Sequence, residues 1–140
     1  MKNPGKLSLT VLFVALLFAS VMSCGAGEPD GDVIVVENDE EFYEHIKADQ
    51  PVVVDFYADW CRPCKIQGPI VSELSTEMKD EIRVLKLDVD AFPRIAAKYQ
   101  VRSIPTIIIF QKGQVMWKEI GLQQKETLQA AVSKQLSKKE

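Results

Sequence analysis

The chain has 140 residues, of which 46% are hydrophobic and 26% are charged, which is the composition of a globular protein with a single core. Its formal net charge of −3 provides no basic excess, so nucleic acid is not expected as a partner. Three cysteines are too few for a small scaffold held together by disulfides.

The first 23 residues have the pattern of an export signal. Lys2 and Lys6 precede an almost wholly apolar run over residues 7–22, and a small serine stands directly before Cys24. This order of basic start, apolar middle and small residue is typical of a secretory signal peptide. The alternative is an uncleaved membrane helix, but the run is shorter than the roughly 20 residues that span a bilayer.

The stretch "VMSC" that ends at Cys24 resembles the lipobox of bacterial lipoproteins, in which cleavage before the cysteine follows attachment of lipid to its sulfur. We therefore expect a signal peptide over 1–23 and a lipidated Cys24. Two or more acyl chains would anchor the protein stably in a membrane. The alternative is an ordinary signal peptide that leaves Cys24 as a free thiol. Either way the protein is expected to be exported, in the periplasm or at the cell surface.

Residues 24–32 are rich in Gly, Pro and Asp and predict a flexible tether. The remaining segment, 33–140, is predicted to be one domain in which strands and helices alternate. The expected strands are 33–36, 52–57, 83–88, 106–111 and 115–120, and the expected helices are 39–47, 61–79, 92–99 and 126–137. Helices between the early strands require parallel pairing, and the final hairpin must be antiparallel. The fold class is therefore α/β, with a mixed five-stranded sheet covered by helices on both faces.

Two local signals mark boundaries within this domain. Asn38 can cap the first helix, and Glu41 three residues later completes the pattern of a capping box. Gly113 lies between the last two strands and can supply the positive φ of a tight turn.

A Cys-x-x-Cys pair, Cys61 and Cys64, begins the long helix directly after the buried strand 52–57. A structural zinc site needs four ligands, usually Cys or His. Besides the pair, the chain has only His45 and Cys24, and because Cys24 is expected to be lipidated, a structural zinc site lacks ligands. The pair's position between strand and helix instead favours a redox-active dithiol.

The helix N-terminus carries unpaired N–H groups and partial positive charge, which stabilise a thiolate. Cys61, the outer residue, is therefore expected to attack disulfides, and Cys64, one turn deeper, to resolve the mixed disulfide. Pro63 suits the first helical turn and stiffens the loop. Two inert core cysteines are the alternative.

Asp55 lies inside a strand, after three valines and before two aromatic residues. Burial raises the pKa of a carboxyl group, so Asp55 is expected to accept the proton of Cys64 when that thiol attacks. The alternative is a structural carboxylate with a partner at the strand's end. Lys86, in the middle of the next strand, can reach Asp55 from there, or it can extend its ammonium into solvent. Pro105 begins another strand, and its peptide bond can be cis or an ordinary trans bond.

The chain from about 33 to 137 closely resembles the thioredoxin family. The residues that carry the resemblance match the family in order and spacing: Asp55, Trp60, Cys61, Pro63, Cys64, Lys65, Pro69, Lys86, Ile104, Pro105, Thr106, Gly113 and Gly121. The resemblance implies a thioredoxin fold with a cis Pro105 beside Cys61, and an Ile104 whose backbone binds an extended substrate segment. It also implies a shallow substrate-binding surface made by Trp60, Ile104, Pro105, Gly121 and Leu122. Arg62 stands where typical thioredoxins have glycine, so it is expected to tune the redox potential.

The expected activity is that of a monomeric protein-disulfide reductase working outside the cytoplasm. Its redox group is the Cys61–Cys64 disulfide itself, with no separate cofactor and no metal. Because the sequence has no Gly-rich nucleotide fingerprint, electrons are expected from another protein at the membrane. The same steps run backwards would oxidise dithiols, so an oxidative-folding catalyst is the alternative. Binding of Cu(I) by the two cysteines is a third hypothesis, and a non-catalytic docking domain is a fourth, disfavoured by the intact cysteine pair and Asp55.

Overall fold

The computed structural model describes residues 32–139 of the chain. The expected signal peptide 1–23, lipidated Cys24 and most of the expected tether therefore lie outside the described residues. The elements follow each other in the predicted order: β1 (Val33–Val35), α2 (Asp39–Ile46), β2 (Val52–Tyr57), α3 (Arg62–Glu77), β3 (Arg83–Asp88), α4 (Pro93–Lys98), β4 (Thr106–Gln111), β5 (Gln114–Ile120), α5 (Lys125–Leu136) and a short 3-10 turn (Ser137–Lys139).

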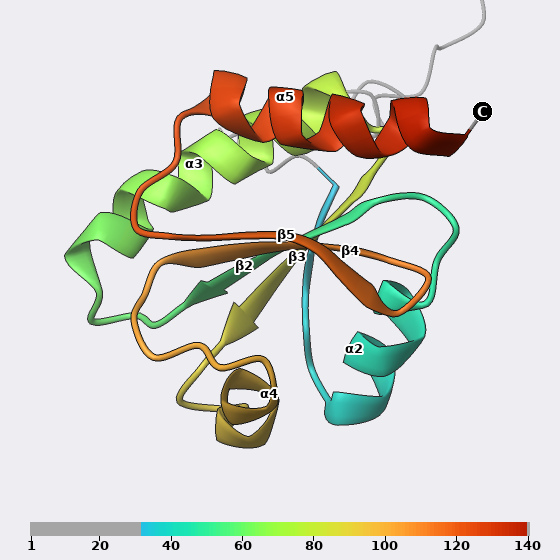
Figure 1. Cartoon of the computed structure of the whole chain (residues 1–140). Helices are drawn as coiled ribbons and strands as arrows, with labels where there is room; N and C mark the ends of the chain where they lie inside the picture. Colours follow the sequence, from blue (N-terminus) through green and yellow to red (C-terminus); the bar gives the residue numbers. More distant parts are fainter. Residues whose placement is uncertain (1–31, 140) are drawn as a thin grey trace, which may run out of the picture.

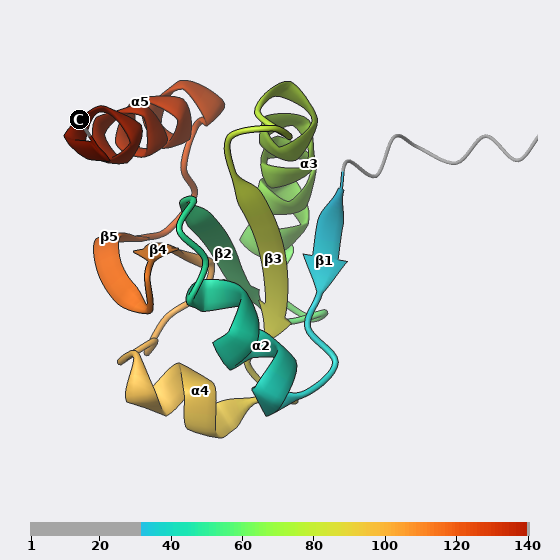
Figure 2. The same cartoon turned by 90° about the vertical axis from the view of Figure 1, so that its right-hand side faces the viewer.

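The five strands form one mixed sheet in the order β1-β3-β2-β4-β5. β1 and β2 run parallel to β3, whereas β4 is antiparallel to both β2 and β5. Helices α3 and α5 cover one face of this sheet, and α2 and α4 cover the other (Figures 1 and 2). The predicted α/β fold with helices on both faces is therefore confirmed.

A separate apolar core fills the space on each side of the sheet, because the central strands are buried on both faces. Between the sheet and α2 and α4 lie Phe42, Phe56 and Phe110, together with aliphatic neighbours. Between the sheet and α3 and α5 lie Leu74 and Leu128 with their neighbours. Since alternate residues of β2 face opposite cores, Asp55 faces the α3 side, as Val53 does.

The predicted capping box at the start of α2 and the predicted turn between β4 and β5 are confirmed in part. The Asn38 side chain accepts a hydrogen bond from the Glu41 N–H at 2.9 Å. In a capping box the Glu41 carboxylate would accept a hydrogen bond from the N–H of the cap residue, Asn38. In the structure it accepts instead from the N–H of the preceding residue, Glu37, at 2.8 Å. In the hairpin turn both Lys112 (φ 51°) and Gly113 (φ 77°) are left-handed, whereas the sequence indicated Gly113 alone.

The predicted start of the long helix was one residue early. Cys61 has extended backbone angles and caps the helix, which begins at Arg62 and ends at Glu77. Its predicted end at residue 79 lies two residues too late. The other helix and strand ends lie within one residue of their predicted positions, and differences of one or two residues are usual for element boundaries.

Candidate active site

The two cysteines lie where β2 ends and α3 begins, at one end of the sheet (Figure 1). They form a disulfide with an S–S distance of 2.06 Å and a Cα–Cα distance of 5.3 Å. The structure is therefore that of the oxidised protein.

Cys61 occupies the N-cap of α3, and its Sγ accepts a hydrogen bond from the Cys64 N–H at 3.2 Å. After reduction, the same N–H and the positive end of the helix would stabilise a thiolate on Cys61. The two residues are almost equally buried, with 3% and 4% of their surface exposed. The position at the helix end, rather than exposure, therefore distinguishes them. Arg62 and Pro63 are the exposed residues between them.

Asp55 is fully buried on β2. Neither of its carboxyl oxygens has a hydrogen-bond partner among the described residues, so the expected alternative of a partnered structural carboxylate does not describe it. Burial raises the pKa of Asp55 from 3.8 to about 7, and the charge of Lys86 offsets part of that rise. A carboxyl group with this pKa can both accept and return a proton near neutral pH.

Lys86 stands opposite Asp55 in the β2–β3 register. Its ammonium lies 4.4 Å from the centre of the Tyr57 ring, a cation–π contact. The ammonium is therefore held against the Tyr57 ring, although the residue stays partly exposed. This position is intermediate between the two alternatives from the sequence, an ammonium that reaches Asp55 and one that extends into solvent. Gly68 of α3 lies above it, where an added Cβ would come within 3.7 Å of the Lys86 Nζ.

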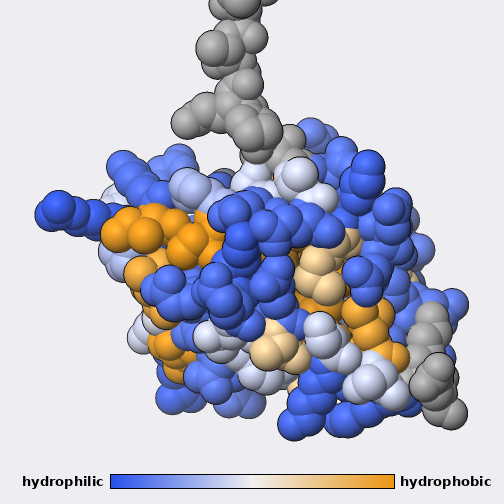
Figure 3. All heavy atoms as spheres, turned by 90° about the horizontal axis from the view of Figure 1, so that it is seen from above, coloured by the Kyte–Doolittle hydropathy of each residue, from blue (hydrophilic) through white to orange (hydrophobic). Residues whose placement is uncertain are grey.

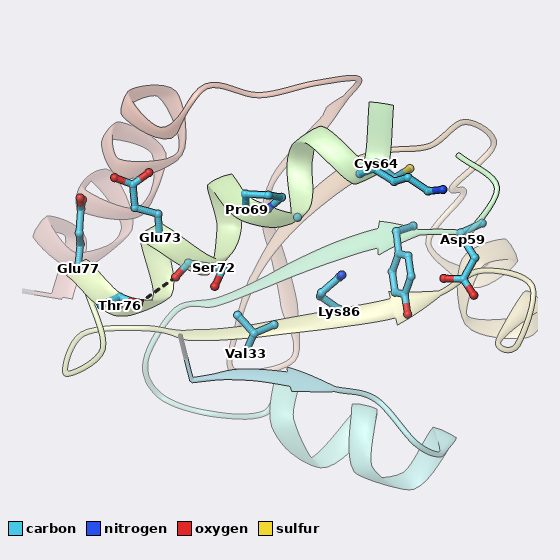
Figure 4. A pocket seen from close by; sticks show the side chains of 13 residues that line it. Val33, Asp59, Cys64, Pro69, Ser72, Glu73, Thr76, Glu77 and Lys86 are labelled. Carbon is cyan, nitrogen blue, oxygen red and sulfur yellow. Dashed lines mark hydrogen bonds between the residues drawn. The ribbon is translucent and has the colours of Figure 1, made fainter. Parts of the chain in front are cut away.

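An open groove of about 1000 Å³ runs between α3 and the β1–β3 edge of the sheet. Figure 4 shows Cys64 and Asp59 at one end of this groove, Glu77 at the other, and Lys86 rising between them from β3. The groove thus gives solvent a route to the Lys86 ammonium, which lies beside Asp55.

The predicted substrate-binding residues come from three segments: Trp60 beside Cys61, the Ile104–Pro105 pair, and Gly121 with Leu122. The Ile104–Pro105 peptide bond is cis, as the family resemblance implies. Ile104 packs against Ala58 and the two cysteines. Trp60 is 72% exposed, and its indole N–H donates to the Asp90 carboxylate at 2.8 Å.

Gly121 and Leu122, the third of these segments, lie in the loop between β5 and α5. Gly121 has a φ of 88°, and its N–H donates to the Pro105 carbonyl at 2.8 Å. Leu122 is 39% exposed. Figure 3 looks down on α3 and α5, a face on which hydrophilic residues predominate and hydrophobic ones gather in smaller patches, one of them toward the end where α3 begins.

Sequence reasoning missed three side chains at this site: Tyr57, Gln67 and Asp90. Gln67 did leave a signal, since it is the glutamine in the otherwise largely apolar stripe that α3 buries. Tyr57 ends a buried strand and was counted only as an aromatic neighbour of Asp55. Asp90 lies in the loop after β3, where nothing in the sequence distinguishes it from a solvated aspartate.

Among residues 32–139 no group of three or more His, Cys, Asp or Glu side chains is arranged to hold a metal ion. Within the same range, none of the helices has the length and apolar character needed to cross a bilayer.

Comparisons with known proteins agree with this geometry. The family model Thioredoxin matches residues 33–134. The chain is 45% identical over 93 residues to a thioredoxin of Rickettsia typhi, a match that covers 66% of this chain and 89% of the relative. It is 50% identical over 89 residues to an M-type chloroplastic thioredoxin of Brassica napus, covering 64% of this chain and 50% of that one.

Solved structures give the same result. The thioredoxin of Malassezia sympodialis aligns with a TM-score of 0.69 and 36% identity, over 76% of this chain and 92% of that one. A mutant thioredoxin from Halobacterium salinarum aligns with a TM-score of 0.69 and 32% identity, over 79% of this chain and 95% of that one. With the family model covering most of the chain and a Cys61–Cys64 disulfide at the start of α3, this protein belongs to the thioredoxin family and is a thiol–disulfide oxidoreductase.

Proposed function

We propose that this thioredoxin is an exported, lipid-anchored protein-disulfide reductase. The observation that carries the chemistry is the Cys61–Cys64 disulfide at the N-terminus of α3, on a chain where the buried Asp55 carboxyl has a pKa of about 7. No separate cofactor or metal is required, because the disulfide itself stores the two electrons.

In the reduced protein, the Cys61 thiolate attacks one sulfur of a substrate disulfide, and the other substrate sulfur leaves as a thiolate. The Cys64 thiol then passes its proton to the Asp55 carboxylate, and the resulting thiolate attacks the Cys61 sulfur. The Cys61–Cys64 disulfide forms and the second substrate thiolate is released. The substrate gains two electrons and the protein loses two. Lys86 keeps part of the Asp55 population ionised, and so able to accept that proton, at neutral pH.

The substrate is proposed to be an extended protein segment that carries a disulfide or dithiol. Trp60, Ile104, Pro105, Gly121 and Leu122 would contact it, as the family resemblance implies. The thioredoxin domain would act as a monomer.

Export and anchoring rest on the sequence "VMSC" after the apolar run 7–22. Lipid on Cys24, followed by the tether 24–32, would hold the thioredoxin domain at a membrane surface in the periplasm or at the cell surface. The electron donor is proposed to be a membrane protein with its own dithiol, since the chain carries no nucleotide-binding fingerprint.

A disulfide oxidase is the second candidate, favoured by Arg62. An arginine next to Cys61 stabilises the thiolate and so makes the disulfide more oxidising. The reduction potential decides between them. A reductase is expected near the thioredoxin value of about −270 mV, whereas a value close to about −120 mV, that of a strong periplasmic oxidant, would establish the oxidase. Reduction of insulin disulfides by the metal-free protein separates both from a Cu(I)-binding module.

A further inference from the structure

Gln67 is a fully buried polar side chain one helical turn after Cys64. A buried amide destabilises a protein unless hydrogen bonds inside the fold replace those it made with water. Its position on α3, facing inward beside apolar neighbours, would suit a leucine or isoleucine equally well for packing alone. The structure instead gives both ends of the Gln67 amide a partner.

Both partners belong to one residue, Gln123, in the loop between β5 and α5. The Gln67 Oε1 accepts from the Gln123 N–H at 2.7 Å, and the Gln67 Nε2 donates to the Gln123 carbonyl at 3.2 Å. The two contacts hold the backbone of Gln123 to the helix that carries the cysteines. Leu122, directly before it, is thereby fixed relative to Cys64.

The same loop is connected to the Pro105 loop on its other side. The Gln123 side chain donates to the Gly121 carbonyl at 3.2 Å, and the Gly121 N–H donates to the Pro105 carbonyl at 2.8 Å. A continuous path of hydrogen bonds therefore runs from α3 through Gln67, Gln123 and Gly121 to Pro105. It joins the helix that carries Cys64, the β5–α5 loop and the loop that carries Pro105.

The far end of the loop is fixed independently of Gln67. Lys125, the first residue of α5, contacts the Glu73 and Glu77 carboxylates of α3 at 2.6 and 2.7 Å. Losing the Gln67 amide should therefore loosen residues 121–123 locally while α5 stays docked on α3.

We propose that Gln67 is a positioning residue for protein substrates: it holds the Gly121–Leu122 part of the binding surface in the geometry that receives an extended polypeptide next to the disulfide. This inference rests on the proposed exchange with protein disulfides. Holding the loop in its bound form before the substrate arrives lowers the entropy that binding must otherwise remove. A small disulfide, which reaches the Cys61 sulfur without contacting residues 121–122, gains little from this order.

The test compares Gln67→Leu with Gln135→Leu. Gln135 is also a buried glutamine, but its side-chain amide donates to the Ala131 carbonyl of its own helix, α5, at 3.4 Å. Each variant is assayed with dithiothreitol as electron donor, once with insulin and once with hydroxyethyl disulfide. Gln67→Leu is expected to raise the KM for insulin roughly three- to tenfold while its kcat changes less than about twofold, because the loop must order on binding. With hydroxyethyl disulfide, the rate constant of Gln67→Leu is expected to fall by less than about twofold. The control variant Gln135→Leu is expected to keep the wild-type KM for both insulin and hydroxyethyl disulfide.

Two further measurements separate positioning from a simple loss of stability. Hydrogen exchange at the Gln123 amide is expected to be slow in the wild type and at least about tenfold faster in Gln67→Leu, with exchange in β2 unchanged. In a double-mutant cycle with Leu122→Ala, the combined effect on the insulin KM is expected to be smaller than the two single effects together, because both act through one surface.

If Gln67→Leu has the wild-type KM for insulin and the wild-type exchange rate at the Gln123 amide, the proposed role of Gln67 is overturned. The proposed function is not affected by that result. An equal loss with insulin and hydroxyethyl disulfide would also overturn the role of Gln67, because it would place the effect at the reacting sulfurs. If Gln67→Leu does not fold, rapid exchange of the Gln123 amide in the wild type overturns the proposal by itself. A wild type that reduces hydroxyethyl disulfide but not insulin would overturn the proposed function together with this inference.

Discussion

Replacing Asp55 with asparagine removes a buried carboxyl group whose ionisation opposes folding. The pKa of Asp55 is raised from 3.8 to about 7, first by burial and with a partial offset from Lys86. A change of about three pKa units, at about 1.4 kcal/mol each, amounts to about 4 kcal/mol of folding free energy.

The sign follows from the order of the two pKa values. Below pH 4 the group is protonated in both the folded and unfolded chains and contributes nothing. Between about pH 4 and pH 7 the unfolded chain loses this proton while the folded chain keeps it, so the wild type becomes less stable as pH rises. Above pH 7 both forms are ionised and the loss levels off.

The free energy of unfolding of the oxidised wild type and of Asp55→Asn is measured by urea denaturation from pH 4 to pH 9. The variant's stability relative to the wild type is expected to rise by about 3–4 kcal/mol between pH 4 and pH 8. Any cost of burying the asparagine amide is independent of pH and cancels from this difference. Asp59→Asn, at an exposed carboxylate four residues on, is the matched control. A stability difference that stays constant with pH, or is larger at pH 4, would refute the reasoning. Disulfide turnover by Asp55→Asn should slow most near neutral pH, where part of the Asp55 population is ionised and can accept the proton of Cys64.

Three further predictions concern the cysteines and Arg62. Cys64→Ser is expected to accumulate mixed disulfides with substrate proteins, whereas Cys61→Ser accumulates almost none; equal amounts on a non-reducing gel would contradict the assigned order of attack. Cys24→Ala is expected to lose radiolabelled lipid and leave the membrane fraction, and persistent membrane association would identify the N-terminus as an uncleaved anchor. Arg62→Gly is expected to lower the reduction potential by roughly 20 mV, since a partly solvated charge contact has a small effect; an unchanged potential in a glutathione redox titration would remove Arg62 from the tuning of this site.

The order of the strands and helices could be predicted because it depends on local patterns. A buried run such as Val52–Tyr57 and an amphipathic stripe such as that of α5 each indicate an element type within a few residues. The register of Asp55 with Lys86 could be expected as well, because neighbouring parallel strands place their middles side by side. The exact start of α3 could not be predicted, since it depends on whether Cys61 joins the helix or caps it.

For the site, the sequence by itself determined the reactive pair and its setting. Two cysteines at a spacing of three, placed between a buried strand and a helix, specify a dithiol at a helix N-terminus whatever surrounds it. The sequence also indicated that Asp55 is buried, because the residues on both sides of it are apolar.

Only the tertiary structure decided which side chains act on that pair. Gln67 and Gln123 are 56 residues apart in the chain, and Trp60 and Asp90 are 30 apart, so no local pattern connects them. The surroundings of the Asp55 carboxyl group depend in the same way on how α3 packs over β2 and β3. This packing leaves the carboxyl group without a hydrogen bond from any described residue. It also places the Lys86 ammonium against the Tyr57 ring. A hydrogen bond or a charge contact requires atoms within a few ångströms of each other. For residues far apart in the chain, that proximity is created by the packing of whole elements.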